Sequence, residues 1–231
     1  MRMARFEVKE LEGTHYVEIH IEDETVRVEA GALNYMVGDI HVYSNVLPPI
    51  STVVKSWLAN ESVYRPVYAG SGVITLESSL GGYHVLELDS ETWLLERGAY
   101  WASEGTVEVG FHREPVTRAI LAGEGPVYLL TRVRGVGKVV LTTRGPVFEH
   151  QLQPGERVVC DGSLVIARTG DVRFNVRRVT ENLMGFLTAG EGWVRVYEGT
   201  GRLLLNPAPF WRYRILNRND SKGDLAVKTS G

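Results

Sequence analysis

Histidine is the residue type in this chain best suited to bind a metal ion or to exchange a proton near neutral pH. No two histidines have the one- or two-residue separation of a histidine metal motif, and none recurs at the period of the internal repeat described below. We therefore expect structural or solvent-exposed histidines, no metal site and no cofactor. The six are His15, His20, His41, His84, His112 and His150.

Three glutamates do recur, each just before a predicted strand: Glu61, Glu124 and Glu191. Carboxylates brought together from three repeats could hold a divalent cation. Each could instead accept backbone N–H bonds at its own turn. We favour the second interpretation, because three carboxylates in one ring repel one another unless a cation lies between them.

The nucleophilic side chains show no catalytic pattern. The chain has no Gly-x-Ser-x-Gly sequence, and nothing in the spacing joins Ser103 or Ser163 to a base. Cys160 is the single cysteine, which excludes an internal disulfide and a cysteine zinc site. We expect Cys160 to be a small buried side chain in a strand, and we expect the protein not to be an enzyme.

Paired glycines punctuate the chain at a regular period. The first glycines of three pairs recur at nearly equal intervals, and each pair lies between strand-like runs. Because glycine adopts positive φ without steric cost, we interpret these residues as repeat turns. They are Gly31 and Gly38, Gly98 and Gly105, and Gly162 and Gly170. Gly-x-Gly sequences recur as well and are also interpreted as turns: Gly70/Gly72, Gly135/Gly137 and Gly199/Gly201.

The repeat predicts an all-β fold of three tandem β-sandwich-like units, about residues 14–80, 81–144 and 145–216. A lone β unit of that size buries little apolar surface, so the three should pack as one body over residues 1–216, with pseudo-threefold symmetry. Residues 217–231 are expected to form a loose tail. The acidic stretch 7–29 is interpreted as a solvated strand face in which Asp23 and Glu24 turn the chain.

Each unit also carries an apolar segment with helical spacing, such as ISTVVKSWLAN in the first unit. We expect a short helical insert in each unit, all emerging at one end of the body. Exposed inserts would form an apolar contact surface larger than a monomer normally leaves bare. The alternative is that each insert covers the core of its own unit. The candidate surface comprises Val54, Trp57, Leu58, Ile120, Leu121, Met184, Phe186 and Leu187.

Composition limits the remaining classes of function. Of the 231 residues 44% are hydrophobic, which is typical of a globular chain. The net charge of −3 gives no general attraction to nucleic acid or anionic lipid. The N-terminus lacks the apolar core of a signal peptide, and no window approaches a membrane-spanning length, so we expect a cytoplasmic protein.

Four passages together carry a family resemblance over about residues 26–205: EAGALNYMVGDI, LERGAYWAS, the Gly-Glu-Gly before the later strands, and LQPGERVVCDGSLVIARTGDVRF. With them the chain resembles the family named for altered inheritance of mitochondria, number twenty-four of that series. The resemblance implies an all-β fold like that of the tryptophan RNA-binding attenuation protein, with the unit duplicated within the chain. It implies no reaction and no catalytic residue.

Two hypotheses of function follow. The first is a non-enzymatic β scaffold that associates with itself, with a protein partner or with a membrane surface through the apolar inserts. The alternative is a small-ligand or RNA-binding module like the attenuation protein. The sequence PFWRYRILNR near the C-terminus interleaves aromatic residues with arginines, as in sites that stack single-stranded bases.

Overall fold

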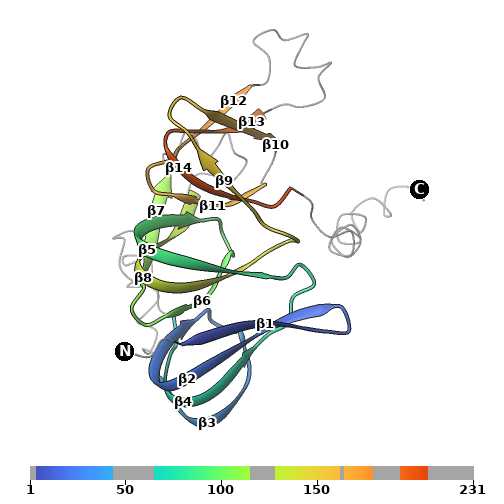
Figure 1. Ribbon diagram of the computed structural model, residues 1–231, viewed down its shortest axis with the longest axis vertical. Helices are drawn as coiled ribbons and strands as arrows, with labels where there is room; N and C mark the ends of the chain where they lie inside the picture. Colours follow the sequence, from blue (N-terminus) through green and yellow to red (C-terminus); the bar gives the residue numbers. More distant parts are fainter. Residues whose placement is uncertain (1–3, 44–64, 115–127, 162–163, 179–192, 208–231) are drawn as a thin grey trace, which may run out of the picture.

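The computed structural model describes residues 4–43, 65–114, 128–161, 164–178 and 193–207, and these residues form fourteen strands and no helix (Figure 1). The strands are β1 (Arg5–Leu11), β2 (Thr14–Val28), β3 (Leu33–Tyr43), β4 (Val67–Leu76), β5 (Tyr83–Leu95), β6 (Tyr100–Glu104), β7 (Glu108–Glu114), β8 (Tyr128–Thr142), β9 (Phe148–Leu152), β10 (Arg157–Asp161), β11 (Val165–Thr169), β12 (Arg173–Arg178), β13 (Trp193–Glu198) and β14 (Gly201–Leu205). The predicted all-β class is confirmed. The proposed helical inserts lie outside the described residues.

All strand pairs in the described ranges are antiparallel. The large sheet has the order β3-β4-β2-β6-β8-β5-β11-β14-β9, with β1 added on β2 and β7 on β8, and a small sheet has the order β10-β13-β12. Figure 1 shows three tiers along the long axis, with β1–β4 at one end, β5–β8 in the middle and β9–β14 at the other end.

In each tier, the second glycine of the Gly-x-Gly sequence lies opposite an apolar residue of a neighbouring strand, so the strand registers of the three tiers correspond. Gly72 of β4 lies opposite Ile21, Gly137 of β8 lies opposite Leu88, and Gly201 of β14 lies opposite Leu152. The described strands run as an open row rather than closing around the expected pseudo-threefold axis. The row ends at β3 on one side and at β9 on the other, and β10 is an edge strand of the small sheet.

Two of the three Gly-x-Gly sequences do not form the expected turns. Gly70 and Gly72 lie inside β4, and Gly135 and Gly137 lie inside β8, all with positive φ. Gly38 likewise lies inside β3. At Gly70 the neighbouring backbone approaches closely: a Cβ there would lie 2.1 Å from the Asp39 carbonyl oxygen of β3. Positive φ and close approach both favour glycine, so the residue type alone does not distinguish a turn from a close contact inside a strand.

The expected turn at Asp23 and Glu24 is also wrong. β2 continues to Val28, with a bulge between Glu22 and Glu24 and a positive φ at Asp23. Ser90 of β5, which occupies the equivalent place in the second unit, has a positive φ at a similar bulge. A bulge absorbs the left-handed residue without ending the strand.

The hydrophobic core consists of three clusters, and each extends across a boundary between tiers. The cluster of the first tier includes Ala102 and Val140 from the second. The cluster centred on Trp93 and Tyr100 includes Ala167 from the third tier. The cluster of the third tier includes Leu94 and Leu130 from the second. The core of the middle tier is therefore continuous with the cores on both sides of it.

Candidate functional site

The edge strand β3 carries a concentration of exposed apolar side chains. Among the described strands β3 pairs only with β4, so its other edge has no partner strand there. Ten large hydrophobic side chains of the described residues are exposed, and half of them lie on this strand. They are Tyr35, Met36, Val37, Val42 and Tyr43. An unpaired edge with apolar side chains is a template for pairing with another chain.

The tiers themselves are joined by strand edges of the same kind. Residues 26–28 of β2 pair with residues 102–104 of β6. Residues 93–95 of β5 pair with residues 167–169 of β11. We call each of these ladders a joint. Both strands of the second joint lie one repeat after the corresponding strands of the first, so the same pairing occurs twice in the chain. Equivalent main-chain bonds flank both ladders at 2.7–2.9 Å: Gly105 N to Thr25 O, Gly170 N to Thr92 O, Glu29 N to Trp101 O, and Glu96 N to Ile166 O.

On the first unit, the strand that corresponds to β6 and β11 is β3. The joint residues 102–104 and 167–169 are buried, whereas residues 35–37, their counterparts on β3, are exposed. The buried sequences are Ala-Ser-Glu and Ala-Arg-Thr, and the exposed one is Tyr-Met-Val. The most apolar of the three segments is thus the one that no described strand covers.

One residue of each internal joint also accepts a hydrogen bond from a strand of its own tier. The Glu104 carboxylate accepts the Lys138 N–H at 3.0 Å, and the Thr169 hydroxyl accepts the Arg202 N–H at 3.1 Å. On β3 the equivalent residue is Val37, which is 63% exposed and offers no acceptor. Position 37 is therefore suited to apolar contact rather than to this hydrogen bond.

Burial raises the pKa of Glu104, and the Lys138 N–H opposes the shift only in part. A carboxyl whose pKa is raised by folding stabilises the fold fully below its unfolded pKa of about 4.3, and this contribution is lost as the pH rises through the folded pKa. Glu104→Gln should therefore match the natural chain near pH 4 and be the more stable of the two at pH 8. Urea unfolding at both pH values tests this expectation. An equal gap at both pH values would contradict it.

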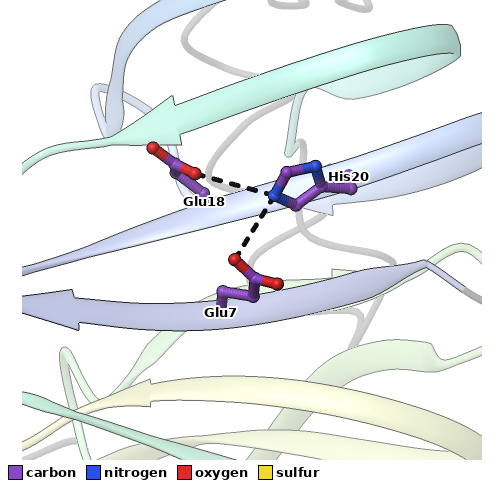
Figure 2. Close-up of side chains that lie close together, drawn as sticks. All are labelled: Glu7, Glu18 and His20. Atoms are coloured by element: carbon purple, nitrogen blue, oxygen red, sulfur yellow. Dashed lines mark ion pairs between the residues drawn. The ribbon is translucent and has the colours of Figure 1, made fainter.

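A second cluster of chemically capable side chains lies on the hairpin of β1 and β2. Figure 2 shows Glu7, Glu18 and His20 together, with the His20 Nε2 atom 3.5 Å from the Glu7 carboxylate and 3.6 Å from the Glu18 carboxylate. One ligand atom from each lies within 4.8 Å of the others. Two atoms on a tetrahedral zinc ion are about 3.3 Å apart, so the spacing suits a divalent cation.

The same cluster already contains a cation of its own. The Lys9 ammonium donates to the Glu18 carboxylate and lies 3.6 Å from the Glu7 carboxylate. The hydrogen bond to Glu18 raises the pKa of Lys9. We interpret the cluster as an ion-pair network that holds β1 against β2.

The sequence contained a signal for this cluster. Glu12 and Gly13 both have positive φ and form a two-residue turn between β1 and β2. Such a Gly-containing pair between two strand-like runs predicts a hairpin, and a two-residue turn fixes which residues lie opposite each other. That register places Glu7 opposite Glu18.

A polar pocket of about 380 Å³ lies where segments from all three tiers meet. Its lining includes two arginines, two threonine hydroxyls and one carboxylate. These residues are Arg97, Arg144, Thr142, Thr143 and Glu96. The pocket could hold a small anionic group against the arginines.

The residues singled out from the sequence are placed as follows. Gly31, Gly98, Gly105 and Gly170 lie in turns, and Gly38 lies inside β3. Cys160 is buried, and burial raises the pKa of its thiol. Gly162, the recurrent carboxylates Glu61, Glu124 and Glu191, and the candidate apolar surface Val54, Trp57, Leu58, Ile120, Leu121, Met184, Phe186 and Leu187 lie outside the described residues.

These features define an all-β protein whose three tiers are joined through strand edges. The mitochondrial biogenesis AIM24 family matches residues 6–208, and the chain belongs to this family. The family resemblance inferred from the sequence is confirmed. Within the described ranges, no helical segment could cross a lipid bilayer.

Two similar proteins come from Streptococcus pyogenes. An uncharacterised protein of serotype M6 is 22% identical over 159 residues, which cover 68% of this chain and 63% of that protein's length. A crystal structure of a Streptococcus pyogenes protein has a TM-score of 0.72 at 17% identity and covers 96% of this chain and 99% of its own. At that identity the likeness concerns the fold alone.

Proposed function

We propose that this protein is a non-enzymatic β scaffold that assembles with itself through the edge of β3. The observation that carries the proposal is the exposed segment of residues 35–37, whose counterparts in the other two units are buried in strand joints. Three adjacent apolar side chains on an unpaired edge are costly for an isolated monomer, because they favour unspecific association. Pairing with a second copy would satisfy the edge and cover the side chains.

Replacing Val37 on the β3 edge with lysine tests this proposal. The natural chain should scatter light as a species above its monomer mass of 25.7 kDa. Val37→Lys should weaken self-association by about tenfold or more, because the ammonium would have to be desolvated in the contact. Val136→Lys is the matched control, since Val136 is 55% exposed but lies within β8, away from the β3 edge. A natural chain that stays monomeric at high concentration would overturn the proposal.

The runner-up is a small-ligand binder, which is supported by the pocket containing Arg97 and Arg144. A monodisperse monomer in the light-scattering experiment would favour it. The RNA alternative rests on the C-terminal aromatic and arginine residues, which lie outside the described ranges.

A further inference from the structure

Each internal joint pairs two kinds of strand. One strand of each kind has no such partner among the described strands, and we call it the leftover copy. One kind is the strand after a glycine turn, which is β6 in the first joint and β11 in the second. Its leftover copy is β3, which pairs only with β4 among the described strands. The other kind is the strand before the glycine turn, which is β2 or β5. Its leftover copy belongs to the last of the three units.

The register identifies that second leftover edge as β10. Val26 of β2 lies opposite Tyr68, and Trp93 of β5 lies opposite Val133. Tyr197 corresponds to these two partners, because it precedes the third Gly-x-Gly as they precede the first and second, and it lies opposite Val158 of β10. Residues 158–160 are therefore the counterparts of residues 26–28 and 93–95.

The surroundings of β10 fit this assignment. Among the described strands it pairs only with β13, so one of its edges has no partner strand there. Val158 and Cys160 point into the third core cluster, as the first and third residues of the other two segments point into theirs. Val159 between them is 55% exposed and is one of the ten exposed large hydrophobic side chains.

We infer that β10 of one copy pairs antiparallel with β3 of a second copy, in the register of the two internal joints. This inference rests on the proposed function and names its partner strand. In this register Val37 lies opposite Val158, Met36 opposite Val159, and Tyr35 opposite Cys160. The contact continues an interface that the chain already forms twice within itself.

Pairing of two β3 edges with each other fits less well. It would not repeat either internal joint, each of which pairs a strand after the glycine turn with a strand before it. A twofold axis at Gly38 would also place Val37 opposite Asp39, whose carboxylate is 92% exposed and would lose solvent in the contact. The β3–β10 contact places apolar side chains opposite apolar side chains. Because its two surfaces differ, each copy can bind one neighbour at each end, and the assembly grows head to tail into a ring or a filament.

Cysteine pairs test the register. In a Cys160→Ser background, Met36→Cys and Val159→Cys are made as separate single-cysteine variants. Opposite residues in an antiparallel pair have Cα atoms about 4.5–5.5 Å apart, within the range of a disulfide. On mixing and mild oxidation the two variants should form a cross-linked heterodimer, and neither should cross-link alone. A variant with both cysteines should give a ladder of higher oligomers.

The outcomes separate the inference from the proposed function. A chain that exceeds 25.7 kDa by light scattering but forms no mixed disulfide would overturn the β3–β10 register and leave self-association standing. A chain that is monomeric by light scattering would overturn both. Cross-linking of Met36→Cys alone would indicate β3–β3 pairing and also overturn the inference. Val136→Cys, mixed with either variant, is the control that should not react.

A charge-swap series avoids the change at Cys160. Met36→Lys and Val159→Glu should each weaken association by about tenfold or more, because each introduces an unpaired charge into the contact. The double variant should recover most of the natural affinity, since lysine and glutamate then lie opposite each other. Failure of the double variant to recover would count against the register.

Discussion

Glu114→Ala should remove about 3–5 kcal/mol from the free energy of unfolding. Glu114 ends β7 and forms an ion pair with Arg168 of β11, and both side chains are more than nine-tenths buried. Arg168 also donates to the Val172 carbonyl at 2.7 Å. Removing the carboxylate leaves the buried guanidinium without its counter-charge, and the loss is a large fraction of the stability of a typical domain.

Urea unfolding with matched variants separates this effect from a general loss of a glutamate. Glu108→Ala on the same strand breaks an exposed contact of 3.4 Å with Arg132 and should cost less than about 1 kcal/mol. Replacing both partners by apolar residues, Glu114→Leu with Arg168→Met, should cost much less than Glu114→Ala, because no buried charge is left unpaired. Equal losses for Glu114→Ala and Glu108→Ala would show that the pair does not link the middle and last tiers.

The class of fold could be predicted because alternation and glycine spacing are local signals. Gly31 and Gly98, for example, lie at turns as expected. The arrangement of the units is not predictable in the same way. Whether three copies close into a ring or form a row depends on the angle at each joint, which a few paired residues set and which leaves no periodic trace in the sequence.

Residue type is also a poor guide to exposure at the joints. Ser103 and Glu104 are polar and buried, whereas Met36 and Val37, at the equivalent positions, are apolar and exposed. Burial at this position is decided by the presence of a neighbouring unit. The apolar edge is therefore recognisable as a contact surface only after the strands are paired. The ion-pair cluster on the first hairpin differs, since the turn at residues 12–13 fixes its register from sequence alone.

Gly72→Ala should lower the free energy of unfolding by about 3–5 kcal/mol, because it combines overpacking with backbone strain. Gly72 has a φ of +156° and lies opposite Gly38 of β3. A Cβ at position 72 would lie 2.2 Å from the Val37 carbonyl oxygen, and neither backbone can move without breaking the ladder.

Gly98→Ala isolates the contribution of the backbone conformation alone. Gly98 has a φ of +74°, but a Cβ there would meet no atom within 4 Å, so the loss should be about 1–2 kcal/mol. Tryptophan fluorescence during urea unfolding measures both variants. The difference between the two losses of stability measures the cost of placing a Cβ where β4 approaches β3. Because Gly72→Ala shifts the edge that we propose as the contact, a variant that still folds should also self-associate less, whereas Gly98→Ala should assemble like the natural chain. Equal losses of stability for the two variants would indicate that β3 adjusts freely and that its edge is not held in a fixed register.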